Sequence, residues 1–272
     1  MIRVIKAELR KNLRRPAFRV GATLVVLLVA INYAIGLAEL IWPAIAPRAG
    51  LNVAALYPDQ FVNSATGAAS LSGAIAMIVG ALMAGSEFTW GTFKTALTQR
   101  AGRLTTATGR VATYLLFTAI LTLIIFAISV LGSVIVAIYQ SHAITWPAAK
   151  DVAKGFGAIW LVISVSGTLG IALGTLFRQA AAAVGTGLIY GLALQVLVVR
   201  FIAGVNNGQL QWLADLFEGQ NTAALLRSFA PPPDFAAAAP AISPERAVLT
   251  LLAYVAVYIG IAAALVRQRD VT

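Results

Sequence analysis

The chain has 272 residues, of which 60% are hydrophobic and only 11% are charged. A soluble protein needs roughly a quarter of its residues charged, so this composition excludes the soluble globular class. The absence of cysteine excludes disulfides, thiolate metal sites and cysteine nucleophiles. The net charge of +10 flanks apolar segments rather than an aromatic-lined groove, so no nucleic-acid partner is expected.

Six apolar segments have the length that an α-helix needs to cross the hydrocarbon core of a bilayer, about 20 residues. They cover residues 17–42, 69–85, 111–139, 156–176, 180–201 and 247–266. The second is the shortest of the six. The predicted fold class is an all-α integral membrane protein, with a six-span domain over residues 17–272. The first segment is longer than a signal-peptide h-region of roughly 7–15 residues, so a retained span is expected.

The distribution of Lys and Arg predicts the orientation of these spans. One side, made of residues 1–19, 86–110, 177–179 and 267–272, holds 14 basic and three acidic residues, whereas the other holds six and seven. Because cytoplasmic loops carry the basic excess, we expect both termini in the cytoplasm. Richness in Ala, Gly and Arg is typical of a GC-rich bacterial genome, so the expected location is a bacterial cytoplasmic (inner) membrane.

Residues 1–16 are predicted to form an amphipathic helix on the inner leaflet. Ile2, Ile5 and Leu9 fall on one helical face, and Pro16 ends the helix before the first span. The cationic residues expected at anionic headgroups are Arg3, Lys6, Arg10, Lys11, Arg14 and Arg15. Membrane lipid is therefore an expected partner. The alternative is that these charges only fix the topology.

The connection between the second and third spans is predicted to carry a short cytoplasmic helix. Glu87 ends the second span, and Gly91 permits a sharp turn. Thr92 can cap a helix in which Phe93 and Leu97 lie four residues apart on one face. A short exposed apolar face of this kind is typical of a docking site for a partner protein.

This loop, the basic N-terminal helix, the six spans and the long last outer loop resemble the ABC type-2 exporter permeases over essentially the whole chain. In that family the loop helix is a coupling helix that docks into a separate ATPase subunit. The resemblance implies that residues 86–110 form the coupling loop. The residues it implicates in ATPase coupling are Glu87, Gly91, Thr92, Phe93, Lys94, Leu97, Thr98 and Arg103. This chain departs from many members at Arg100 or Ala101, where they have Pro, and at Arg110, where they often have Lys.

The resemblance also implies a function and a set of partners. The chain would be the permease subunit of an ATP-driven exporter that moves a hydrophobic or amphipathic substrate out of the cytoplasm. Its expected partners are cytoplasmic ABC ATPase subunits and a second copy or a related permease chain. ATP and Mg²⁺ are expected in the ATPase. The alternatives are an ATP-independent secondary transporter and a non-transporting membrane assembly protein.

No catalytic constellation is found in the sequence. It contains no nucleotide-binding loop, and His142 is its single histidine. We therefore expect a non-catalytic chain with no metal site and no cofactor of its own. Glu39 and Arg200, near the outer ends of the first and fifth spans, are expected to reach water by snorkelling.

Two further features concern packing and the outer surface. Small residues four apart predict close helix packing, within the chain or between chains, at Gly170, Gly174, Gly187 and Gly191. The outer loop over residues 204–245 holds two apolar-rich stretches, 210–217 and 223–229. These predict short helices at the outer interface, with an ordinary surface loop as the alternative.

Overall fold

The structure is a computed structural model that describes residues 9–10, 14–42, 53–89, 103–204, 210–229 and 242–268. All the regular elements in these residues are helices, and six segments are long and apolar enough to cross a membrane. The predicted all-α six-span fold class is therefore confirmed. The chain is a multi-pass membrane protein.

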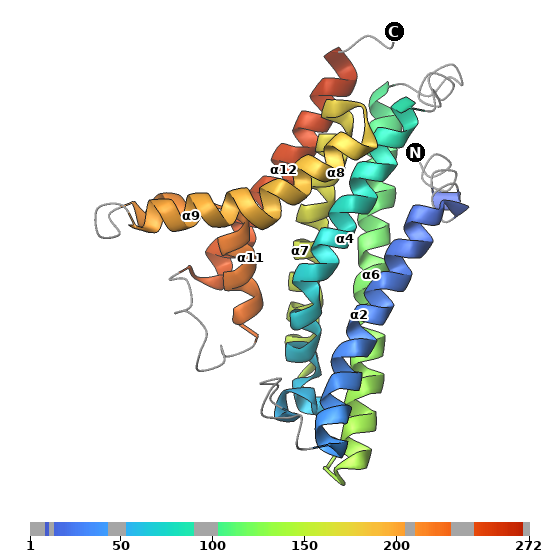
Figure 1. The fold of residues 1–272 in the computed structure, drawn as a ribbon, viewed down its shortest axis with the longest axis vertical. Coiled ribbons are helices and arrows are strands. Elements are labelled where there is room, and N and C mark those ends of the chain that lie inside the picture. The colour runs from blue at the N-terminus through green and yellow to red at the C-terminus, as the bar shows by residue number, and fades with distance from the viewer. Residues whose placement is uncertain are drawn as a thin grey trace.

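Four long helices form the body of the molecule (Figure 1). They are α2 (Pro16–Ile41), α4 (Phe61–Thr89), α6 (Arg103–Tyr139) and α7 (Ala149–Phe177). They lie side by side and alternate in direction, so that α2 and α6 begin at the end of the bundle where α4 and α7 finish (Figure 1). The last helix, α12 (Pro244–Gln268), packs along α7 and finishes at that same end.

The most extensive helix pair is α4 with α7. A β-carbon on Gly170 would overlap the carbonyl oxygen of Met77, and one on Gly174 would lie 2.8 Å from that of Ala81. Small residues therefore let the two backbones touch, as membrane helices require when lipid gives no hydrophobic drive for association. Helices α4 and α7 form the centre of the bundle.

The second span differs in length from the prediction of 69–85, because the apolar helical segment runs over Pro58–Ser86. Its first turns carry Asn63, Ser64 and Thr66, which lower the hydropathy of that stretch. Within the helix this polarity is partly satisfied locally, since the Thr66 hydroxyl donates to the Asn63 carbonyl over 2.6 Å. In the segment's most apolar window 61% of residues are buried, so protein rather than lipid surrounds most of it.

Two predicted loops also contain more helix in the structure than the sequence indicated. Helix α4 continues to Thr89 and α6 begins at Arg103, so both ends of the predicted loop 86–110 are helical. The predicted outer loop 204–245 contains two short helices, α10 (Gln211–Ala214) and α11 (Glu218–Arg227). Helix bonding does not stop where hydropathy falls, and so the second and third spans are longer in the structure, Pro58–Ser86 and Thr108–Tyr139, than hydropathy alone predicted.

The fifth span has a different course from the other helices. Helix α8 (Ala180–Ile189), a π-helical turn η3 (Tyr190–Leu194) and α9 (Gln195–Gly204) form one continuous segment. Figure 1 shows it crossing the bundle and projecting sideways, with α9 clear of the four long helices. We refer to residues 180–204 as the projecting arm. A π turn inside a helix is a recognised cause of a change in its direction.

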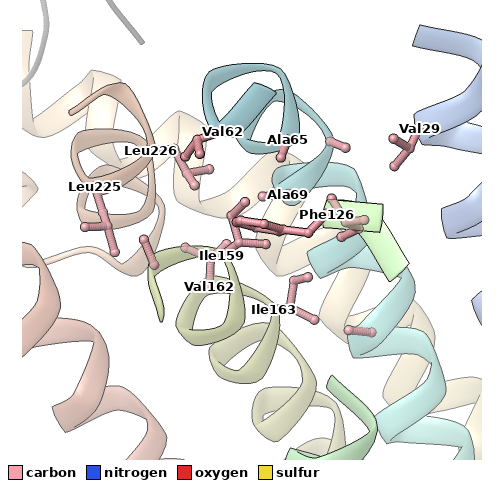
Figure 2. Close-up of a cluster of buried hydrophobic side chains, with 14 of the residues drawn as sticks. Val29, Val62, Ala65, Ala69, Phe126, Ile159, Val162, Ile163, Leu225 and Leu226 are labelled. Atoms are coloured by element: carbon pink, nitrogen blue, oxygen red, sulfur yellow. The ribbon is translucent and has the colours of Figure 1, made fainter. Parts of the chain in front are cut away.

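A continuous apolar core joins these helices beside α11 (Figure 2). Helix α11 packs against α12, α7 and α4, so it belongs to the folded body rather than to a free outer loop. The labelled core side chains come from α2, α4, α6, α7 and α11 and are Val29, Val62, Ala65, Ala69, Phe126, Ile159, Val162, Ile163, Leu225 and Leu226.

Candidate functional site

The ends of α4 and α6 meet at the end of the bundle where the coupling loop was predicted. The structure describes the backbone of Glu87 in the last turns of α4 and of Arg103 at the start of α6. The other predicted coupling residues lie outside the described residues; these are Gly91, Thr92, Phe93, Lys94, Leu97 and Thr98. Their docking role stays a prediction, but the two helix ends that carry them are placed.

The end of α4 is fixed to the turn between α7 and α8. A β-carbon on Gly85 would lie only 2.6 Å from the backbone nitrogen of Ala180. The turn is made by Arg178, whose φ of 55° is left-handed and whose N–H donates to the Gly174 carbonyl over 3.1 Å. The guanidinium of Arg178 also lies 5.8 Å from the centre of the Phe88 ring. Backbone contact and a cation–π interaction thus join the last turns of α4 to the start of the projecting arm.

Arginines surround this end of the bundle. The Arg15 guanidinium donates to the carbonyl of Met83 in α4 over 3.4 Å, which places a cation beside the negative end of that helix. Arg10 and Arg14 are exposed, as an interfacial role requires. The other predicted headgroup contacts lie outside the described residues; they are Arg3, Lys6 and Lys11.

Arg110 is a residue whose position sequence reasoning missed. It was expected at the edge of the third span, but only 3% of it is exposed. It lines a small cavity of about 30 Å³ with Ile171 and Thr175 of α7 and Ala262 of α12. A buried charge needs compensating groups around it. Because Arg110 is buried beside α7 and α12, it restricts how α6 can shift relative to these two helices. Hydropathy gives no signal of such burial, because it places any Arg beside a span in the interface.

Hydroxyl groups join the long helices further inside the bundle. The buried Tyr114 hydroxyl donates to the Ala76 carbonyl of α4 over 2.5 Å. Thr118 of α6 and Ser164 of α7 share a hydrogen bond of 2.9 Å, and the Trp160 indole donates to Thr118 over 3.1 Å. These polar groups hold α4, α6 and α7 together through hydrogen bonds.

The predicted packing glycines divide into three kinds. Gly170 and Gly174 lie against the backbone of α4, as described above. Gly187 in α8 lies against the Met77 side chain, where a β-carbon would be 2.5 Å from the sulfur. Gly191 in the π turn has no described atom within 4 Å of where its β-carbon would be. Three of the four therefore serve packing within this chain.

Arg200 and Glu39, the two charged residues expected to reach water, differ in how exposed they are. Arg200, in α9, is exposed. Glu39, near the end of α2, is only 3% exposed, and neither of its carboxylate oxygens has a hydrogen-bond partner among the described residues. The expectation of a water-exposed Glu39 is wrong, because η1 (Val53–Leu56) packs over this end of α2.

A buried carboxylate lies where α11 meets α12 and the projecting arm. Glu218, at the start of α11, is 6% exposed and accepts a hydrogen bond of 2.8 Å from the Tyr258 hydroxyl. Gln195 of α9 accepts one of 3.0 Å from the neighbouring Gly219 N–H. Tyr254 donates to the Leu216 carbonyl over 3.0 Å. Burial raises the pKa of the Glu218 carboxyl to about 7, and the Tyr258 hydrogen bond only partly opposes this.

Comparison with known families adds one finding. A family model described as a protein of unknown function, DUF2705, matches residues 23–272. The chain belongs to this family. No curated protein matches it. The DUF2705 match covers both the Gly85–Ala180 contact and the Glu218 cluster, and it excludes the predicted interfacial helix over residues 1–16. In the described part of this DUF2705 chain, the end of α4 is in backbone contact with the start of α8. The cluster around the buried Glu218 contacts the arm further along, at Gln195 of α9.

Proposed function

We propose that this chain is the transmembrane permease subunit of an ABC exporter, driven by a separate ATPase that binds ATP and Mg²⁺. The observation that carries the proposal is the backbone contact of Gly85 with Ala180. It joins the helix that leads into the predicted docking loop to the first turn of the projecting arm. A push on the loop would therefore move α4 and the arm together. Differential binding of two such arrangements is what an ATPase needs in order to do work on a partner.

The arginines of the described residues support the proposed orientation. Arg15, Arg110 and Arg178 all lie at the end of the bundle where α4 finishes and α6 begins. A basic end is the cytoplasmic one under the positive-inside rule, which gives both termini a cytoplasmic location. We place the chain in a bacterial inner membrane on this basis together with its composition.

The projecting arm supports pairing with a second copy or a related permease chain. Its apolar side chains Leu192, Leu197 and Phe201 are 69%, 65% and 74% exposed. In the described structure α9 packs chiefly against the adjoining π turn and α10, and Gln195 at its start also accepts a hydrogen bond from Gly219 of α11. A partner permease packed on this arm would form a subunit interface through which a hydrophobic or amphipathic substrate could leave the cytoplasm.

The decisive experiment replaces the two predicted docking residues, Phe93 and Leu97, with Asp in the full-length chain. The tagged protein is purified from its host membrane, and the amount of co-purified ABC ATPase and its ATP hydrolysis are measured. A charge in an apolar docking site is expected to abolish both, because the carboxylate would have to be desolvated. The matched control is Ile144→Asp, which changes a 48% exposed apolar residue at the opposite end of the bundle.

Retention of the ATPase by the double Asp variant, at the level of Ile144→Asp, would refute the docking proposal. Active transport without any ATPase partner would instead favour an ion-driven transporter. Membrane levels of the two variants are compared first, so that loss of the ATPase is not mistaken for loss of the permease.

A further inference from the structure

A large cavity among the described residues lies away from the arginine-rich end. Its volume is about 1040 Å³, and it is bounded by the beginnings of α4, α7 and α12 and by the end of α11. Small-molecule sites in proteins commonly occupy 300–1,000 Å³ or so, about the size of this space. No part of the coupling machinery described above contributes to it.

The wall of the cavity changes from charged to apolar along two helices. On α7, Asp151 and Lys154 in the first turns are followed on the same face by Leu161, and Trp160 beside it also lines the cavity. On α12, Glu245 in the first turn is followed by residues 248, 249 and 252, which are all Val or Leu. Spacings of three and seven residues put Asp151, Lys154 and Leu161 on one side of α7, and spacings of three and four do the same for the α12 series. Both helices therefore present a polar end and an apolar end to the same space.

The polar end favours a cation. Three carboxylates line it, from Asp59, Asp151 and Glu245, against the single ammonium of Lys154. Asp59 Oδ1 is buried without a hydrogen-bond partner among the described residues, while its Oδ2 accepts a bond of 3.3 Å from Gln60. Because Oδ1 has no exposed surface, the Asp59 carboxylate adds negative charge to this end of the cavity without offering that oxygen as an open acceptor.

The apolar end opens toward the surface that faces lipid. Leu249 and Leu252 on α12 are 68% and 50% exposed, and Trp160 on α7 is 37% exposed. The indole N–H of Trp160 is already used by Thr118 and the Leu115 carbonyl, so its ring offers the cavity an apolar and π-electron surface. An alkyl chain can therefore remain among the lipids while the group attached to it occupies the charged end.

We propose that this cavity binds a membrane amphiphile with a cationic nitrogen in its headgroup, held by the carboxylates of Asp151 and Glu245, with the charge of Asp59 beside them. The alkyl chain runs between α7 and α12. If the chain is the proposed exporter, this amphiphile is its substrate class, and that part of the inference rests on the proposed function. Binding to the cavity itself requires neither ATP nor an ATPase. Failure of the docking experiment and failure of this one are therefore separate results.

The absence of cysteine from the chain provides a direct test. Ser228 lines the cavity and is exposed, so Ser228→Cys gives a nearly isosteric thiol at its wall. The full chain is purified in a maltoside detergent, and maleimide labelling is timed with dodecyltrimethylammonium, dodecyl sulfate or dodecanol added. The ammonium compound is expected to slow labelling about tenfold at roughly 90% occupancy, and the other two to leave it nearly unchanged. Ser141→Cys, exposed and outside the cavity, should be labelled at one rate throughout.

Charge variants in the Ser228→Cys background then identify the binding groups. Asp151→Asn combined with Glu245→Gln is expected to weaken the apparent Kd for dodecyltrimethylammonium by about tenfold or more, since two attractive charges are removed. Lys154→Gln, at the same surface, is expected to tighten it. Equal protection by the sulfate or by dodecanol would overturn the proposal, as would no protection by any probe. An unchanged Kd in the double variant would also overturn it.

Discussion

Protonation of Glu218 is expected to control how firmly α11 is held against α12. The pKa of its carboxyl is raised from about 4.5 to about 7, first by burial, so the folded chain binds this proton more tightly than the unfolded chain does. Stability therefore falls as pH rises between these two values, and it changes no further above about pH 7. The shift corresponds to about 3 kcal/mol in the free energy of unfolding.

The assay is thermal unfolding of the purified chain in detergent, from pH 5 to pH 8. For the unmodified chain we expect the midpoint to fall over this range. Glu218→Gln removes the titrating group and keeps an oxygen that can accept from the Tyr258 hydroxyl, which now donates over 2.8 Å. Its midpoint should lose that share of the pH dependence and exceed that of the unmodified chain at pH 8.

The control is Glu245→Gln, which neutralises an exposed carboxylate at the start of α12. It should keep the pH dependence of the unmodified chain, because Glu218 is still present in this variant. If Glu218→Gln and the unmodified chain show the same dependence on pH, Glu218 is not the group responsible and its buried environment is wrongly described.

Two substitutions test helix packing by the same unfolding assay. Gly170→Ala places a methyl group on a backbone carbonyl of α4 and is expected to destabilise the chain by about 1–3 kcal/mol, whereas Gly191→Ala, with open space around it, should not. Equal midpoints for the two variants would contradict the close α4–α7 contact. Tyr114→Phe leaves the Ala76 carbonyl without its buried donor and should lower stability by about 1–3 kcal/mol; an unchanged midpoint would mean that this bond is not formed.

The sequence predicts the number and kind of membrane helices because that information is local. Apolar length alone identifies all six, including the second, whose polar first turns conceal its true beginning at residue 58. The local sequence pattern does not contain the direction in which a helix runs relative to its neighbours. The apolar run of residues 180–202 fits a straight span equally well, yet the structure turns it sideways at the π turn over Tyr190–Leu194. Only packing against neighbouring helices decides between the two courses.

The candidate sites show the same division between local and distant information. The coupling loop was predicted from a local motif, and its central residues lie outside the described residues, so that prediction stays open. The Glu218 cluster depends on contacts about 40 positions apart in the chain, as between Glu218 and Tyr258. Tyr254 and Tyr258, four residues apart in the apolar middle of the last helix, were a visible signal of a polar contact on one face. Arg110 gave no such signal.

Gly85 offers a test of whether the docking loop and the projecting arm move as one unit. Its missing side chain lets α4 touch the first turn of α8, and a β-carbon there would lie 2.7 Å from the Ala180 α-carbon. Because backbone cannot move aside as a flexible side chain can, Gly85→Ala is expected to separate the two helices. The matched control is Gly185→Ala, on α8 itself, where no described atom lies within 4 Å.

The measurement uses a single thiol, Arg200→Cys, at an exposed position of α9 that is not among the apolar side chains proposed for the subunit interface. If ATP binding by the ATPase moves the arm, the maleimide labelling rate of this thiol should depend on ATP in the otherwise unmodified complex and in Gly185→Ala. In Gly85→Ala the ATPase should still co-purify, since the docking loop is intact, but the dependence on ATP should be lost. An ATP-dependent rate that survives in Gly85→Ala would show that force reaches the arm by another route. Arg110 of α6, which is buried beside a cavity that α7 and α12 also line, would then be a further residue to change.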